Sequence, residues 1–209
     1  MMKKRTRILL PLLLIALIFA GLLGGYVYIK RGGVKIESTI DCVPDSAVHY
    51  YQKDALWKDA PLGDSVYHMG DSGCLTTCLA ALIHMQEIEV EGIETAITPG
   101  TLNQFFSENQ VYDSEGNLQW DVLEDVLHTE IVGGDAAEFE NGELETLLTR
   151  AVYPIVCVRM PESGNYHFVL LIGSENGTYW CMDPLNKKEE PVSLSEFNDR
   201  IYSVRYINN

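Results

Sequence analysis

The chain has 209 residues, of which 30 are acidic and 15 are Lys or Arg, so its formal net charge is −15. All 30 acidic residues follow residue 31, but only 9 of the basic ones do, which gives that part a formal charge of −21. This balance argues against a nucleic-acid-binding protein, because such proteins need a basic surface for phosphates. The 5 cysteines are too few and too scattered for a disulfide-stapled mini-protein, and their spacing does not match a structural zinc site.

An apolar segment lies near the start of the chain. Residues 8–29 carry no charge over 22 positions, which is long enough to cross a bilayer as a helix. The basic residues of segment 1–7 indicate that the amino terminus lies in the cytoplasm. A cleavable signal peptide has a shorter apolar core, so we expect an uncleaved signal-anchor and a single-pass protein of the cell membrane. Residues 30–45 are then predicted to be a stalk or linker, and residues 46–209 one extracytoplasmic domain.

Helices are predicted in the first part of this domain. Apolar residues recur at helical spacing after Gly73 and predict a helix over residues 74–84. Thr98-Pro99, a cap residue followed by proline, predicts the start of a second helix. Shorter helices are predicted at residues 120–127 and 142–150.

The carboxy-terminal third is rich in β-branched and aromatic residues, which favour strands. Strands are predicted at residues 153–159, 167–173, 179–182 and 201–206. Helices followed by hairpin-linked strands indicate an α+β fold, with a helical lobe packed on an antiparallel sheet.

Cys74 is the residue on which a functional interpretation depends. It follows Gly73 at the start of the first predicted helix, where the field of the helix end stabilises a thiolate. Its backbone N–H is free to bind an oxyanion. A buried core residue is the competing interpretation, since free cysteines are among the most buried residues. Cys78 lies one turn further on, without the field of the helix end, and is predicted to be core.

His167 and Asp183 are the candidates for its partners. His167 opens an apolar strand after the flexible segment 163–165, so its ring should stand at a sheet edge. A hairpin loop centred on Glu175 pairs His167 with Asp183, whereas a two-residue turn at Asn176-Gly177 moves Asp183 to the other face. A strand-capping histidine and an Asp-Pro turn are the structural alternatives. The sequence leaves the register open.

These residues occur in an order that is typical of one enzyme family. Gly73-Cys74, Tyr166-His167-Phe168-Val169 and Met182-Asp183-Pro184 resemble the motifs of the papain-like cysteine peptidases of the bacteriocin-leader-processing type. The resemblance runs from about Tyr50 to Tyr206. It also includes residues 51–57, Gly63, Thr77, Thr98-Pro99 and Trp120-Asp121.

The resemblance implies a papain-like fold and a role for each residue of the site. Cys74 is the nucleophile, His167 the general base and acid, and Asp183 the residue that orients the imidazole. The family also uses a glutamine before the cysteine to help bind the oxyanion. Gln52 is the candidate for this place, and His68 is its competitor. No metal or cofactor is implied.

Two departures limit what the resemblance implies. Family members commonly have Gly-Pro where this chain has Leu75-Thr76. The leader-processing members are fused to a transporter domain that this sequence does not contain, so their double-glycine substrate is not carried over.

We therefore expect a membrane-anchored, extracytoplasmic cysteine peptidase that acts on a peptide or protein substrate and binds no nucleic acid. A papain-like binding module without activity is the competing hypothesis. A cell-wall-peptide hydrolase or transacylase that uses the same thiol is another. Convergence of Cys74, His167 and Asp183 favours an enzyme, whereas a disulfide at Cys74 removes the nucleophile.

Overall fold

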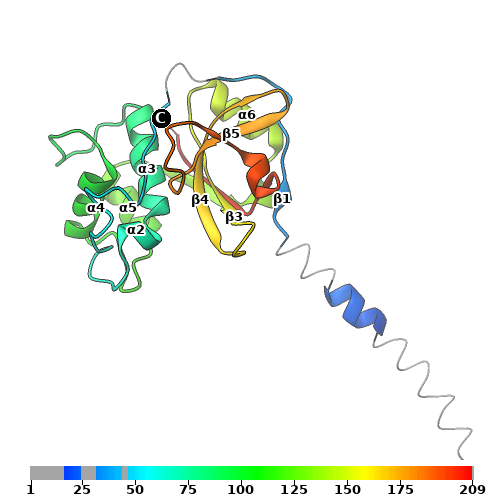
Figure 1. Ribbon diagram of the computed structural model, residues 1–209, viewed down its shortest axis with the longest axis horizontal. Coiled ribbons are helices and arrows are strands. Elements are labelled where there is room, and N and C mark those ends of the chain that lie inside the picture. Colours follow the sequence, from blue (N-terminus) through cyan, green and yellow to red (C-terminus); the bar gives the residue numbers. More distant parts are fainter. Residues whose placement is uncertain (1–16, 25–31, 44–46, 209) are drawn as a thin grey trace, which may run out of the picture. The chain divides into compact units, whose positions relative to one another are not determined.

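The structure is a computed structural model that describes residues 17–24, 32–43 and 47–208 (Figure 1). The chain divides into two compact units, residues 1–33 and residues 34–209. All the strands in the described part of the chain belong to the second unit.

In the first unit, residues 17–24 are helical and their side chains are exposed. The predicted cytoplasmic segment 1–7 and most of the predicted span at residues 8–29 lie outside the described residues. Within the described part of the chain, no helix combines the length and the apolar character needed to cross a membrane.

The second unit is an α+β domain with antiparallel strand pairing, as the sequence predicts. Six strands form one sheet in the order β2-β8-β3-β4-β5-β6, and β1 pairs with β7 in a two-stranded sheet. The strands are β1 (Val34–Lys35), β2 (Ile131–Asp135), β3 (Ile155–Arg159), β4 (Tyr166–Glu175), β5 (Thr178–Met182), β6 (Val192–Ser193), β7 (Arg200–Ile201) and β8 (Ser203–Ile207).

The helices α2, α3, α4 and α5 lie together on one side of the sheet, and α6 lies apart from them (Figure 1). Their bounds are α2 (Met69–Ser72), α3 (Cys74–Met85), α4 (Pro99–Glu108), α5 (Trp120–Leu127) and α6 (Asn141–Thr149), with 3₁₀ turns η1 (Ala136–Glu138) and η2 (Leu194–Phe197). Thr98 caps α4 in a capping box, because its hydroxyl accepts from Thr101 N–H and the Thr101 hydroxyl accepts from Thr98 N–H. The four helices that the sequence predicts are all present.

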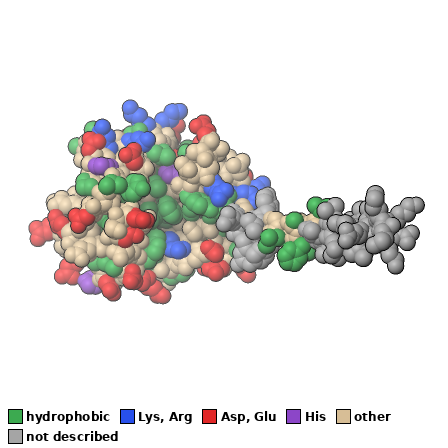
Figure 2. Space-filling model, turned by 90° about the horizontal axis from the view of Figure 1, so that it is seen from below, with side chains coloured by type: hydrophobic (Ala, Val, Ile, Leu, Met, Phe, Trp, Pro, Cys, Tyr) green, Lys and Arg blue, Asp and Glu red, His purple; other side chains and the backbone are tan. Residues whose placement is uncertain are grey.

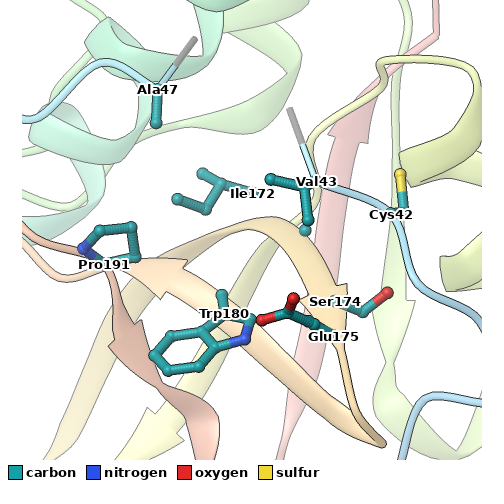
Figure 3. A pocket seen from close by; sticks show the side chains of 9 residues that line it. Cys42, Val43, Ala47, Ile172, Ser174, Glu175, Trp180 and Pro191 are labelled. Atoms are coloured by element: carbon teal, nitrogen blue, oxygen red, sulfur yellow. The ribbon is translucent and has the colours of Figure 1, made fainter. Parts of the chain in front are cut away.

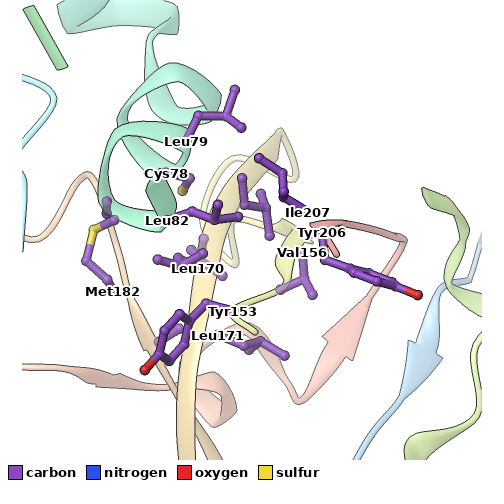
Figure 4. Close-up of a cluster of buried hydrophobic side chains, with 14 of the residues drawn as sticks. Cys78, Leu79, Leu82, Tyr153, Val156, Leu170, Leu171, Met182, Tyr206 and Ile207 are labelled. Atoms are coloured by element: carbon purple, nitrogen blue, oxygen red, sulfur yellow. The ribbon is translucent and has the colours of Figure 1, made fainter. Parts of the chain in front are cut away.

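The core is built around β4, whose residues 169–174 are all buried. Both α3 and α6 contact this strand. Cys78 and Leu82 of α3 face Leu170 of β4 within a cluster of buried side chains (Figure 4). The continuous apolar run of β4 therefore reflects burial on both faces of a strand rather than a sheet with one wet face.

The β4–β5 hairpin does not have the loop centred on Glu175 that pairs His167 directly with Asp183. Its turn is Asn176-Gly177, where both residues have positive φ (52° and 82°), and Glu175 pairs with Thr178. Two consecutive positive φ angles are the mark of the type I′ turn that suits the twist of a hairpin. The two-residue turn is therefore the correct one of the two alternatives.

A β-bulge then restores the side-chain alternation that this turn reverses. Without it, the turn would set Asp183 opposite Leu170, on the sheet face away from His167. The register shifts by one residue between Leu171 and Gly173, so that Leu170 pairs with Met182. Continued by one position, this register puts Asp183 on the same face as His167.

The predicted linker at residues 30–45 is wrong for residues 34–43, which fold onto the second unit. The strand β1 in this segment pairs with β7. The Thr39 backbone N–H and hydroxyl both donate to the Glu145 carboxylate on α6. The folded domain therefore begins at residue 34.

Gly73 separates α2 from α3 at a point of close contact. A Cβ here would lie 2.5 Å from the Met69 carbonyl oxygen and 2.7 Å from Met69 Sδ. The φ of Gly73 is −83°, which any residue adopts, so the requirement for glycine is one of space. Because Gly73 has no side chain, Met69 of α2 can pack against the backbone directly before Cys74.

We expect Gly73→Ala to lower the free energy of unfolding by about 1–3 kcal/mol, because the added methyl group forces Met69 or the start of α3 to move. Gly142→Ala is the matched control, since nothing lies within 4 Å of its added Cβ. Chemical denaturation of both variants and of wild type measures the effect. A Gly73→Ala chain as stable as wild type would contradict the close contact.

Candidate active site

Cys74 begins α3 and borders a cavity of about 390 Å³. As the first helical residue, it has a backbone N–H without an acceptor inside the helix. The helix end places partial positive charge beside the thiol, and the residue is only partly buried. The cavity is lined by Gln52, Lys53, Asp71, Ser72, Cys74, Met160, Ser163, Asn165, Tyr166, His167 and Leu185.

His167 lies in the same cavity wall and is tied to Asp183. It is the second residue of β4 and is 3% exposed. Its ring Nε2–H donates to Asp183 Oδ1 at 2.6 Å. The same oxygen accepts the Leu185 backbone N–H at 2.8 Å, so the turn after Asp183 fixes the carboxylate. With Nε2 engaged, Nδ1 is the ring nitrogen available to the Cys74 thiol.

The surroundings of His167 favour its protonated form. Burial lowers the pKa of the ring, but hydrogen bonds to Asp183 and to Cys74, together with the negative charges on both partners, raise the pKa to about 9. The Asp183 carboxylate and the Cys74 sulfur thus both favour the protonated form of the imidazole. This arrangement allows a proton to move between sulfur and ring and back.

Gln52 is placed in the cavity by two hydrogen bonds from segments distant in sequence. Its backbone N–H donates to the Pro184 carbonyl at 2.9 Å, next to Asp183. Its side-chain Nε2 donates to the Gly70 carbonyl at 2.9 Å, which leaves the second hydrogen of this amide group for another acceptor. The residue is 2% exposed, and its Oε1 has no hydrogen-bond partner.

His68, the competitor for the same place, does not line this cavity. It is an exposed residue that precedes α2 as its N-cap. Of the two candidates, Gln52 is the one that lies beside Cys74 and His167.

All five cysteines are free thiols, so Cys74 has no disulfide partner. Burial raises the pKa of Cys157 to about 11 and raises the pKa values of Cys78 and Cys181 well above their ordinary range. Cys78 is buried in the core, as predicted, and its thiol donates to the Phe168 carbonyl at 3.4 Å. Only Cys74 and Cys42 are partly accessible.

Another cavity, of about 320 Å³, lies beside Cys42 and Trp180 (Figure 3). Its lining includes Pro191 and Glu175 but no histidine, and it shares no residue with the cavity at Cys74. In the described part of the chain, no group of three or more His, Cys, Asp or Glu side chains is arranged to hold a metal ion.

Sequence reasoning missed the segment that follows α4 and also borders Cys74. Tyr112 and Leu118 pair across a tight turn, and a second hollow beside Cys74 is lined by both. The signal was present, because Asp113 begins a run with Gly116 that is typical of turns. It did not indicate that the turn lies next to the thiol.

No protein-family model and no curated protein sequence matches the chain. Among solved structures, it is similar to a "putative C39-like peptidase" from Bacillus anthracis, with a TM-score of 0.50 and 13% sequence identity. The match covers 81% of this chain and 98% of that one. The fold is that of a C39-like peptidase. At 13% identity the similarity supports the fold alone. The role assigned to each site residue therefore depends on the geometry described above.

The raised pKa of His167 makes stability depend on pH. The pKa rises from 6.5 to about 9 on folding, so the stabilisation is fully present below about pH 6.5 and is lost as the pH rises through about 9. In Asp183→Asn the charge is gone and burial lowers the pKa of His167. We therefore expect wild type to lose more unfolding free energy than Asp183→Asn between pH 6.5 and pH 9.

Chemical denaturation across this range and NMR titration of the His167 ring measure both effects. Asp59→Asn is the matched control, since the Asp59 side chain is 86% exposed and far less able to influence a buried ring. An unchanged His167 pKa in Asp183→Asn would remove Asp183 from the site.

Proposed function

We propose that the chain is a cysteine peptidase that hydrolyses peptide bonds through Cys74, His167 and Asp183. The observation that carries the proposal is the 2.6 Å bond from His167 to Asp183 in a cavity wall shared with Cys74. A nucleophile, a base within reach and a group that orients the base are the three parts that thiol catalysis needs.

In the first half of the reaction, His167 takes the proton of the Cys74 thiol. The thiolate attacks the carbonyl carbon of the peptide bond and forms a tetrahedral intermediate. The Cys74 backbone N–H and the free hydrogen on Gln52 Nε2 bind the oxyanion. The protonated ring then donates to the nitrogen of the leaving amine, the C–N bond breaks, and the acyl group remains on sulfur as a thioester.

In the second half, water resolves the thioester. His167 accepts a proton from the water as its oxygen attacks the acyl carbon. The C–S bond breaks, the carboxylic acid leaves, and His167 returns the proton to the Cys74 sulfur. Asp183 does not exchange a proton in this sequence. It holds Nε2 so that Nδ1 faces the sulfur, and it stabilises the imidazolium.

The first part of the sequence is the basis for a proposal about where the enzyme acts. We propose that residues 8–29 anchor the chain in the cell membrane and that the peptidase domain lies outside the cytoplasm. The support is the run of 22 uncharged residues and the basic residues of segment 1–7 before it. Free thiols are compatible with this location, since an unpaired catalytic cysteine must stay reduced to act.

We expect a peptide-linked epoxide to label Cys74 and the domain to cleave a mixed fluorogenic peptide library. Cys74→Ala should abolish both, and His167→Ala should lower the labelling rate by roughly 10²- to 10⁴-fold because the general base is lost. Cys42→Ala is the matched control, as the other partly accessible thiol, and should leave both rates unchanged. Intact mass and fluorescence are the measurements. Labelling without any cleavage would assign the chain to binding modules and not to peptidases.

For the anchor, we expect the full chain to sediment with membranes and its domain to be digested when protease is added to intact spheroplasts. A chain that starts at residue 32 should stay in the supernatant after lysis. A cytoplasmic marker protein controls for leakage. A membrane-bound domain that resists protease until the spheroplasts are lysed would reverse the proposed orientation.

A further inference from the structure

Cys74 lies between two hollows. One is the 390 Å³ cavity lined by His167, which we name the His167 cavity. The other has a volume of about 230 Å³ and we name it the Phe168 hollow. Its lining is Leu62, Ser72, Cys74, Leu75, Thr76, Tyr112, Gly116, Asn117, Leu118, Trp120 and Phe168. The two hollows share Cys74 and Ser72, so an extended peptide bound at the thiol has room on both sides.

The two hollows differ in charge. Lys53, Asp71 and His167 line the His167 cavity, whereas no charged side chain lines the Phe168 hollow. This is unusual on a domain so acidic, and Figure 2 shows acidic side chains spread over the face in view with apolar ones between them. The apolar walls of the Phe168 hollow include Leu118 and Trp120, which are both partly exposed.

Two polar groups in the walls of this hollow are paired with each other. The Tyr112 hydroxyl and the Thr76 hydroxyl are 2.8 Å apart and buried. Burial also raises the pKa of Tyr112, which keeps the hydroxyl neutral. With this pair satisfied and no charged side chain in the lining, the wall does not select for a charged ligand.

The outer wall is a preformed turn. Asp113 Oδ1 accepts the backbone N–H groups of Glu115 and Asn117, at 2.8 and 2.9 Å. Gly116 has a φ of 77°, a conformation that glycine adopts without strain. Tyr112 and Leu118 pair across the turn. The hollow is thus formed before any ligand arrives, which lowers the entropy lost on binding.

The chemistry decides which part of a substrate lies on which side. The leaving amine takes its proton from His167, so it lies against the ring, in the His167 cavity. The acyl part bonds to the Cys74 sulfur and extends in the other direction. On that side lies the Phe168 hollow.

We propose that the Phe168 hollow is a specificity pocket that binds a large apolar side chain, aromatic or branched aliphatic, on the acyl side of the cleaved bond. The proposal rests on the proposed peptidase function. The volume of the Phe168 hollow, about 230 Å³, is several times the space of about 30 Å³ that one water molecule takes in the liquid, so the hollow accepts a whole side chain. An apolar side chain that enters the hollow displaces water from its apolar side chains, and this favours apolar over charged substrates.

The test uses tripeptide vinyl sulfones, in which the peptide occupies the acyl side and the thiolate adds to the vinyl carbon. The two residues next to the electrophile are varied in turn through Leu, Phe, Ala, Glu and Lys. The second-order rate constant for Cys74 labelling is measured by intact mass. At one of the two positions we expect Leu or Phe to react about 10- to 100-fold faster than Glu or Lys.

A pair of charge variants ties this preference to the hollow. In Leu118→Glu, the labelling rate with the apolar probes should fall about tenfold, and the ratio of the Lys-probe rate to the Glu-probe rate should rise. In Leu118→Lys, the ratio of the Lys-probe rate to the Glu-probe rate should fall. Leu56→Glu is the matched control, because Leu56 is 85% exposed and lines neither hollow at Cys74. It should leave every ratio unchanged. Circular dichroism checks that all three variants are folded.

Iodoacetamide separates the failure of this proposal from the failure of the proposed function, because it has no peptide to occupy the hollow. If iodoacetamide labels Cys74 in a His167-dependent manner but the peptide probes show no side-chain preference, the pocket proposal is wrong and the peptidase proposal stands. If Cys74 reacts no faster than in His167→Ala, both are wrong. If Leu118→Glu and Leu118→Lys leave the side-chain preferences of the probes unchanged, the pocket proposal is also wrong.

Discussion

Helix α3 packs along the buried strand β4, and the relative position of the thiol and the imidazole follows from this contact. The Cys78 thiol of α3 donates a hydrogen bond to the carbonyl of Phe168, which is the residue next to His167. One turn earlier on the same helix is Cys74, which therefore lies beside the ring. Each large apolar side chain buried between the two elements contributes about 1.5–3 kcal/mol. The pairing of sulfur and ring thus depends on the contact between a helix and a buried strand of the core and not on loops.

The His167–Asp183 pair is less easily explained as a contribution to stability. Both side chains are nearly withdrawn from water, with 4% and 11% of their surface exposed. Removing two charges from water costs several kcal/mol, and an apolar pair of the same size is often at least as stable. A buried, fully oriented ion pair at the edge of a cavity is more typical of a functional site than of a structural one. The bulge in β4 that brings Asp183 to the face of His167 fits the same interpretation, since bulges often redirect side chains near active sites.

What could be predicted from the sequence was local. The start of α3 and the cap at Thr98 depend on residues within one turn of each other, and both are where they were expected. The register of Asp183 could not be obtained in this way. Gly173 lies at the bulge and is a weak signal for one, but it does not fix which residue of β4 is the extra one. The segment 34–43 was taken for a linker because its pairing partners lie more than 100 residues away.

In the candidate site, too, the local motifs could be predicted from the sequence but their arrangement in space could not. Cys74, His167 and Asp183 were found as separate motifs, and the structure brings them together. For Gln52 the sequence offered two candidates, and its backbone bond to Pro184 explains why it is the one beside the thiol. The missed strand β2 contains two consecutive glycines, Gly133-Gly134, which weaken the signal for a strand although β8 pairs with its whole length.

The departure of Leu75-Thr76 from the Gly-Pro of the resembling family gains a physical meaning from the structure. Both residues line the Phe168 hollow, and the Thr76 hydroxyl holds Tyr112 in its wall. Neither residue contributes a group to the proposed proton transfers between Cys74 and His167. In the proposed peptidase, these two residues therefore belong to the wall beside the nucleophile and not to the reacting groups. A departure confined to the wall of the site agrees with a change in substrate rather than a loss of the proposed activity.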